Sequence, residues 1–445
     1  MLKYEVIYNE LRQLIQLGEL AAGVRLPSIR SLSERFACNK STVLTALKKL
    51  EHEHLTYSVP KSGYYVVDHQ LPQIPSPSAM IDFATSSPAW HAFPYKDFQH
   101  CINKAIDTYQ ANLFQYGTPR GLPSLIAESQ KLLESYQVFA QKEHVFVTSG
   151  VQQALALLSL MPFPNRRTTV LVEQPSYHLY MDFIKTHRLP VVGIQRTHEG
   201  IDLDQLERLF CSGDIKFFYT MPRFHNPLGL SYTFKQKEAL VHLAHKYDVY
   251  IVEDDYLADF DLNTKRDPLY SRDLHDRVIY LKSFSKIMFP GLRIGLAVLP
   301  GALVEPFQQY RTTFDIDSSM ISQAALELYL KSGMFERYRA QVSETYTTRG
   351  KILQQSMNTH LHMYPYSTEL GMHSHVVLPK GVNMNMLIHQ LEQQHIMIDR
   401  IDRNYIDDFY RERILKLNVS NVDTAQIEKG ISAIADALHD RSNYY

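Results

Sequence analysis

Apolar residues recur at helical spacing in three short segments near the amino end of the chain. These segments are residues 3–17, closed by Gly18, a second helix capped by Ser28, and a third that begins near Asn39. The predicted inward positions are Val6, Ile7, Leu11, Leu14, Ile15, Leu32, Phe36, Val43, Leu44, Leu47 and Leu50. Two apolar runs, 55–59 and 64–67, flank a turn at 60–63 and predict a β-hairpin. Together these elements predict a winged helix-turn-helix, a geometry that also occurs in small interaction domains without DNA.

Later in the chain the pattern changes to short continuous apolar runs, which predict buried strands. They lie at 145–148, 169–172, 249–252 and 278–281. A helical pattern follows from 306 to 331, and strands near 374–378 and 413–419 predict a final small α+β domain from about residue 340. Three prolines at 72, 75 and 77 mark residues 68–80 as a semi-rigid linker. The domains are therefore predicted at 1–67 and 81–445, with an α/β fold in the larger one.

Composition and charge add modest information. A chain of 445 residues is too long for one core, and its net charge of −1 indicates neither a nucleic acid nor a membrane partner. The first 67 residues differ, because nine Lys or Arg against six Asp or Glu give a charge of +3. The three cysteines are scattered and indicate neither a disulfide framework nor a metal site. We find no signal peptide and no apolar run long enough for a membrane span, and expect a cytoplasmic protein.

The most informative candidate for chemistry is Lys286, which follows the predicted strand at 278–281. A lysine at the end of a buried strand is costly unless it is paired or chemically used. Ser283 and Ser285 precede it, and Arg293 follows seven residues later. That set suits a Schiff-base lysine, with Ser283 and Arg293 holding a phosphate. Taken alone, the pattern also fits an ordinary surface lysine.

Three further segments carry candidate side chains. Asp254 follows the strand at 249–252, and a carboxylate there could keep a pyridine nitrogen protonated. Tyr256 and Asn226 are candidates for hydrogen bonds to the hydroxyl of the same ring. The strand-turn-helix at 145–155 presents free backbone N–H groups near 150–152 to an anion, and Tyr177 offers a stacking face. Each candidate also has an ordinary explanation. The segment of Asp254 could be an acidic loop, the segment of Asn226 a simple turn, and Tyr177 an ordinary loop tyrosine.

Taken in order, these segments resemble the fold-type I, PLP-dependent aminotransferases from about residue 81 to the carboxyl terminus. The motifs are TSGVQQ at 148–153, EQPSY at 173–177, NPLG at 226–229, EDDY at 253–256 and the segment 283–293. The resemblance implies pyridoxal 5′-phosphate as cofactor and Lys286 as its Schiff-base and catalytic lysine. The other implied cofactor-binding residues are Asp254, Tyr256, Asn226, Tyr177, Ser283, Ser285, Arg293, Val151 and Gln152, with Tyr116 reaching the cofactor of a partner subunit. Simple packing is the alternative for Tyr116.

The resemblance also fails at one position. The family usually carries an arginine for the substrate carboxylate before the core of its last strand, where this chain has Lys416. A lysine supplies charge but no bidentate fork, so ordinary transamination of α-amino acids is in doubt and Lys416 is the candidate effector-binding residue. Four arginines nearby, Arg400, Arg403, Arg411 and Arg413, are possible substitutes, and the sequence does not select among them.

The amino-terminal domain resembles the GntR-type winged helix-turn-helix. The similarity lies in the segments 18–20, 23–28, 41–43 and 62–66. It implies that Arg30, Lys40, Ser41 and Thr42 face DNA and that the wing tip, with Lys61 and Gly63, enters the minor groove. Most of these would be phosphate contacts, which set affinity rather than sequence choice.

A GntR-type head joined to an aminotransferase-like body resembles the MocR group of transcriptional regulators. The resemblance implies a homodimer that binds an operator in double-stranded DNA. It also implies an amine or amino-acid effector that displaces Lys286 from the cofactor and forms an external aldimine. Two alternatives stay open: a working aminotransferase that carries a DNA-binding domain, and a regulator for which PLP itself is the effector.

Overall fold

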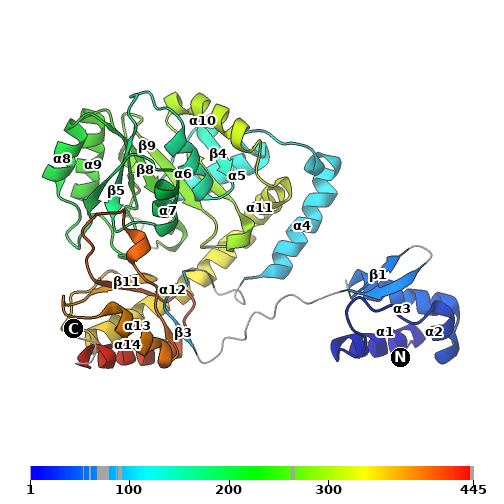
Figure 1. Ribbon diagram of the computed structural model, residues 1–445. Coiled ribbons are helices and arrows are strands. Elements are labelled where there is room, and N and C mark those ends of the chain that lie inside the picture. The colour runs from blue at the N-terminus through cyan, green and yellow to red at the C-terminus, as the bar shows by residue number, and fades with distance from the viewer. Residues whose placement is uncertain are drawn as a thin grey trace. The chain divides into compact units, whose positions relative to one another are not determined.

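The computed structural model describes residues 2–53, 55–59, 62–67, 80–86, 88, 93–261 and 266–440. The chain divides after Ala79 into two compact units, each with its own hydrophobic core (Figure 1). The predicted linker lies outside the described residues, apart from Met80.

The amino-terminal unit is a winged helix-turn-helix. Its elements are α1 (Lys3–Gln16), α2 (Ile29–Arg35), α3 (Lys40–His52), β1 (Thr56–Val59) and β2 (Gly63–Val66), with β1 and β2 antiparallel. The hydroxyl of Ser28 caps α2 as predicted and accepts a hydrogen bond from the Ser31 N–H at 3.1 Å. The prediction for Val6 is wrong, because its side chain is 41% exposed and Tyr8 is buried instead. The buried face of α1 is centred on Ile7 and Leu11, and Val6 lies at the edge of that face.

The second unit is built on a seven-stranded sheet. In spatial order the strands are β4 (Val145–Thr148), β10 (Gly295–Val298), β9 (Val278–Ser283), β8 (Tyr250–Asp254), β7 (Ile215–Thr220), β5 (Thr169–Gln174) and β6 (Val191–Gln195). Strand β10 is antiparallel to both of its neighbours, β4 and β9, and runs opposite to the other six strands. All four strands predicted from apolar runs are present in this sheet, and the predicted α/β class is confirmed.

Helices pack on both faces of the sheet, which explains why its strands are apolar throughout. They are α5 (Pro123–Ser135), α6 (Val151–Leu160), α7 (His178–Thr186), α8 (Leu203–Cys211), α9 (Phe234–Lys246), α10 (Gly301–Phe314) and α11 (Met320–Lys331). Helix α4 (Tyr95–Tyr109) packs against α11. Alternate residues of one strand enter different cores: Val170 and Val172 belong to one hydrophobic cluster and Leu171 to another. The helical stretch predicted at 306–331 is two helices, because Ser319 caps a new helix after a break.

A smaller α+β part completes the second unit. It contains α12 (Met334–His360), β11 (His373–Val377), α13 (Met384–Gln393), β12 (Ile396–Met397), β13 (Ile414–Asn418) and α14 (Thr424–His439). Strand β3 (Ile81–Asp82), at the beginning of the unit, pairs in parallel with β12, so the segment 81–86 belongs to this carboxyl-terminal part. The strands predicted near 374–378 and 413–419 correspond to β11 and β13.

No helix in the described ranges is both long and apolar enough to cross a membrane. The same part of the chain contains no group of three or more His, Cys, Asp or Glu that could hold a metal ion.

Candidate cofactor site and DNA-binding surface

A cavity of about 220 Å³ lies at the carboxyl ends of the parallel strands of the large sheet. This is where α/β proteins usually place their ligands. Its walls are Gly150, Val151, Gln152, Tyr177, Leu179, Met221, Asn226, Asp254, Tyr256, Ser283, Ser285, Lys286, Pro290 and Arg293. Ten of the eleven cofactor residues predicted from the sequence therefore line one cavity. Tyr116 is the exception, and the roles of the ten toward a cofactor stay predictions.

Lys286 reaches the cavity from the loop that follows β9. Its ammonium donates to the hydroxyl of Ser86 at 2.9 Å and to the carbonyl of the same residue. The pKa of Lys286 is lowered from 10.5 to about 8, chiefly by burial and also by the charge of Lys416, while Asp254 opposes the shift. A lysine with this pKa is neutral far more often at physiological pH than an exposed one, as a nucleophilic amine requires.

Asp254 ends β8 and is buried. One carboxylate oxygen, Oδ2, accepts a hydrogen bond from the hydroxyl of Tyr219 at 2.9 Å. The other, Oδ1, is enclosed and has no partner within the described part of the chain. The pKa of Asp254 is raised to about 7, chiefly by burial and also by the nearby charge of Asp255, while the Tyr219 hydroxyl and Lys286 oppose the shift. An unpartnered buried acceptor at this position is suited to a protonated ring nitrogen.

The two residues predicted to contact a ring hydroxyl differ in their present partners. The Asn226 side chain has a buried Oδ1 without a described partner. The Tyr256 hydroxyl donates to the carbonyl of Phe224 at 2.6 Å. In this arrangement the Tyr256 oxygen can only accept, so Asn226 carries the predicted contact more directly.

One corner of the cavity is formed by Ser283, Ser285, Arg293 and the first turn of α6. Gly150 precedes that helix with φ at +82°, and a Cβ there would lie 3.2 Å from Nη2 of Arg293. The same Nη2 donates to the carbonyl of Ser149 at 3.0 Å, which holds the guanidinium beside the helix end. A free helix N-terminus with an arginine and two hydroxyls is a suitable receptor for a phosphate.

Tyr116 and Lys416 do not line this cavity. Tyr116 is 83% exposed and does not line the cavity of its own chain, so its predicted contact with a partner subunit stays a prediction. Lys416 lies on β13 with 2% of its side chain exposed, and its ammonium pairs with Oδ2 of Asp399 at 3.0 Å. The sequence reasoning did not find Asp399.

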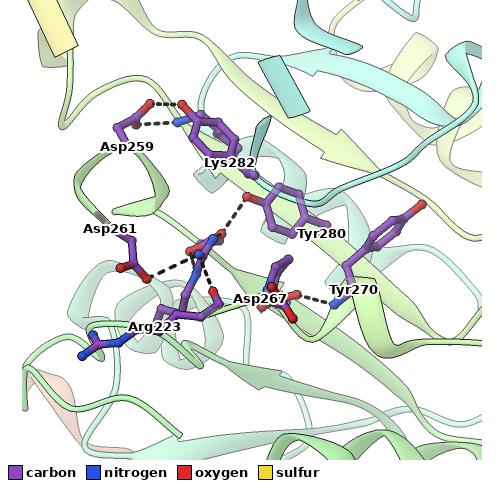
Figure 2. A network of polar contacts seen from close by, with 12 residues as sticks. Arg223, Asp259, Asp261, Asp267, Tyr270, Tyr280 and Lys282 are labelled. Carbon is purple, nitrogen blue, oxygen red and sulfur yellow. Dashed lines mark hydrogen bonds and ion pairs between the residues drawn. The ribbon is translucent and has the colours of Figure 1, made fainter. Parts of the chain in front are cut away.

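A buried polar network beneath the cavity was also missed (Figure 2). Arg223 donates through Nε to Oδ1 of Asp255 at 3.0 Å and through Nη2 to Oδ2, which also accepts from the Tyr280 hydroxyl at 2.7 Å. Arg223 is also 3.5 Å from Asp261. Asp255 follows directly after Asp254, so the network fixes the backbone that delivers the cavity carboxylate. An acidic residue next to a candidate site and an arginine upstream were the only signals in the sequence.

A second buried pair involves Lys282, which lies on β9 four residues before Lys286. Lys282 and Asp259 are fully buried with 2.5 Å between Nζ and Oδ2, and the Tyr136 hydroxyl donates to Oδ1 of the same aspartate (Figure 2). Lys282 therefore has a structural counter-ion, whereas Lys286, four residues later, contacts only oxygen atoms of Ser86 among its hydrogen-bond partners in the described residues.

In the amino-terminal unit the predicted DNA-facing side chains lie at the surface. Lys40 and Ser41 are exposed in the first turn of α3, and Thr42 is half-buried. Arg30 is exposed but pairs with Glu34 at 3.0 Å. In the wing, Gly63 has φ at +129° and a Cβ there would meet Nε of Arg25 at 3.1 Å, which adds Arg25 to the candidates. Lys61 lies outside the described residues.

Comparison with known proteins assigns both parts of the chain. Residues 81–434 match the family model for aminotransferase class I and II, and residues 3–66 match that for bacterial regulatory proteins of the gntR family. An uncharacterized HTH-type transcriptional regulator of Bacillus subtilis, YcxD, is 52% identical over 98% of this chain and 100% of its own length. Aromatic-amino-acid aminotransferase 1 of Thermococcus litoralis is 26% identical over 83% of this chain and 91% of its own.

Solved structures support the same fold. The kynurenine aminotransferase of Pyrococcus horikoshii, solved in complex with PMP, aligns with a TM-score of 0.74 at 24% identity, over 82% of this chain and 92% of that chain. LysN, the α-aminoadipate aminotransferase of Thermus thermophilus, aligns with a TM-score of 0.71 at 24% identity, over 81% and 92%. The chain therefore belongs to the class I and II aminotransferase family, and its gntR-type amino-terminal domain gives it the architecture of the MocR-type regulators.

Proposed function

We propose that this protein is a DNA-binding transcriptional regulator whose aminotransferase-like unit holds PLP and binds an amine or amino-acid effector. One observation carries the proposal: a cavity containing a buried lysine and a buried unpartnered carboxylate oxygen occurs in the same chain as a winged helix-turn-helix. The relative named as an HTH-type transcriptional regulator, which matches this chain along nearly its whole length, supports it.

The residues of the cavity fit PLP. Oδ1 of Asp254 and Oδ1 of Asn226 are buried polar atoms without described partners, and a ring nitrogen and a ring hydroxyl would satisfy both side chains. At the other end, a Cβ at Gly150 would press on Arg293, so the glycine keeps room for an anion beside the guanidinium. We therefore assign the ring to the Asp254 end and the phosphate to the Arg293 end.

PLP supplies an aldehyde that binds primary amines covalently and reversibly. Lys286 would hold that carbon until an effector amine replaces it, and its lowered pKa favours release and return of a proton near neutrality. Asp254 would hold a proton on the ring nitrogen, and the face of Tyr177 would stack on the ring. Ser283, Ser285, Arg293 and the N–H groups of Val151 and Gln152 would fix the phosphate and so orient the aldehyde.

The first turn of α3 and the wing would bind DNA. Lys40, Ser41 and Thr42 stand at a helix N-terminus, where backbone N–H groups also attract phosphate. Effector binding can change DNA affinity only by binding one arrangement of the protein more tightly than another. A homodimer would provide such arrangements, and the exposure of Phe114 and Tyr116, at 70% and 83%, supports a partner subunit in that region. Because its proposed partner is operator DNA, we propose that the regulator acts in the cytoplasm.

The test is an absorbance titration of the full chain loaded with PLP, followed in parallel by DNA binding. We expect a Schiff-base band near the edge of the visible range that changes with an amine, together with a change in DNA affinity. The Lys286→Ala variant should lose the band and still bind DNA. A variant that keeps the band would refute the assignment of Lys286 as the Schiff-base lysine. DNA binding that follows PLP alone would identify PLP as the effector. Turnover of amines without any change in DNA binding would instead favour the aminotransferase.

A further inference from the structure

The family usually has an arginine that binds the substrate carboxylate at the position of Lys416. In this chain the charge of Lys416 is already neutralised by another residue of the same chain. Lys416 is almost completely buried, with 2% of its side chain exposed, and its ammonium lies 3.0 Å from Oδ2 of Asp399. The Asp399 side chain is 40% exposed. A buried ammonium requires a counter-charge, and Asp399 supplies it from the solvent side of the pair.

This pair lies near Lys286, although neither of its residues lines the cofactor cavity. Lys416 and Asn418 lie two residues apart on β13 and therefore point to the same side. The amide of Asn418 contacts Nδ1 of His373 at 3.0 Å, and Nε2 of His373 lies 3.4 Å from the Ser86 hydroxyl that binds Lys286. The charge of Lys416 also contributes to the lowered pKa of Lys286, after burial. The ion pair and the reactive amine thus share one enclosed region.

The arginines that could replace Lys416 are mostly engaged elsewhere. Arg403 pairs with Asp182 at 2.5 Å, and Arg411 lies 3.7 Å from Asp402. The guanidinium of Arg413 binds the backbone carbonyls of Lys380 and Val382. Arg400 is exposed at the surface next to Asp399.

The histidine beside the ion pair, His178, favours an effector with neutral polar groups. His178 lies beside the pair, and its Nδ1 is enclosed without a partner among the described residues. Burial lowers the pKa of His178, and the positive charge of Lys416 lowers it further, so the imidazole is neutral at physiological pH. A neutral imidazole nitrogen offers a hydrogen bond to a hydroxyl or amide, and no charge to a carboxylate.

We infer that the effector is a primary amine without a carboxylate on its amine-bearing carbon, and that Asp399 sets this specificity by occupying Lys416. This inference rests on the proposed function. An α-amino acid would have to lose its hydration and displace Asp399 before its carboxylate could reach the lysine, and Lys416 offers it no bidentate fork in return. An amine lacking that group leaves the pair intact.

The test compares amines with the amino acids from which they differ by one carboxylate. The probes are ethanolamine and serine, isobutylamine and valine, and 2-phenylethylamine and phenylalanine. Each is titrated into the PLP-loaded full chain, the apparent Kd is taken from the change in absorbance, and concentrations are expressed as unprotonated amine. For the best-binding pair we expect the amine to bind about tenfold or more tightly than its amino acid.

Asp399→Asn gives the decisive comparison. The substitution removes the counter-charge of Lys416, so we expect the preference for the amine to shrink by about tenfold or to reverse. Arg400→Gln is the matched control at the neighbouring exposed position and should leave the preference unchanged. A wild-type preference for amino acids, or a preference that Asp399→Asn does not alter, overturns this inference and leaves the proposed function standing. If no probe changes either the spectrum or DNA binding, the proposed function falls and this inference falls with it.

Discussion

The ion pair between Arg223 and Asp255 provides the sharpest test of how the site is supported. Both side chains are at least 95% buried, and Nε and Oδ1 are 3.0 Å apart. At that distance, with an effective dielectric constant of roughly 20, the attraction is about 5 kcal/mol. Arg223→Met would leave the Asp255 carboxylate with the Tyr280 hydroxyl as its remaining side-chain donor in the described residues. Removing one partner of a buried pair costs about 3–5 kcal/mol, because the other charge stays buried and uncompensated.

A double-mutant cycle separates this cost from general damage. Asp255→Asn should be milder, at about 1–3 kcal/mol, because Arg223 keeps the Arg266 carbonyl at 2.8 Å and Asp261 at 3.5 Å. The double variant should be about as stable as Asp255→Asn alone, which gives a coupling energy of about 3–5 kcal/mol, equal in size to the loss for Arg223→Met. Urea unfolding of the full chain, followed by far-UV circular dichroism, measures all four proteins. Additive effects, or a loss below about 1 kcal/mol for Arg223→Met, would refute the reasoning.

Three further predictions concern pH and DNA. Because the pKa of Lys286 is lowered to about 8, the rate of PLP capture should rise with pH and level off above about 8. Lys416→Met should move that inflection upward, and an unmoved inflection would contradict the contribution of Lys416. The pKa of Asp254 is raised to about 7, so between its unfolded value of about 4 and pH 7 the folded protein binds more protons than the unfolded chain. The free energy of unfolding should therefore fall as pH rises through this window, and the fall should be smaller in Asp254→Asn. An equal pH dependence in both proteins would argue against the shift. Lys40→Gln should weaken binding to every DNA sequence and reduce the slope of log K against log salt concentration by about 0.9. Lys48→Gln, near the other end of the same helix, is the control and should change neither. Equal slopes in the wild type and both variants would exclude a phosphate contact at Lys40.

Much of the cofactor site could be predicted because its parts are local. Lys286, Asp254 and Tyr177 each follow an apolar strand within a few residues, and the geometry of a parallel sheet brings the carboxyl ends of its strands together. The order of the motifs then identified the family without any knowledge of distances. The same local logic gave the winged helix-turn-helix, where Ser28 and the periodic apolar positions mark the helices.

Contacts between distant segments could not be predicted in this way. Asp399 lies 17 residues from Lys416, and Ser86 lies 200 residues from Lys286. Nothing in the local sequence around either lysine selects its partner, because the choice depends on how the segment 81–86 and strand β13 pack in the folded unit. The failure at Val6 has a similar origin, since the exact direction of the buried face depends on the neighbouring helices.

The sequence by itself determined the two-part organisation, the fold class, the family and the side chains that line the cavity. Periodicity, strand ends and motif order are properties of short segments, and short segments retain them in any fold. The tertiary structure decided the charge state of the site: which carboxylate neutralises Lys416, which groups surround Lys286, and which oxygen of Asp254 stays without a partner. Those properties depend on burial and on distances of about 3 Å between residues far apart in the chain, and only folding sets them.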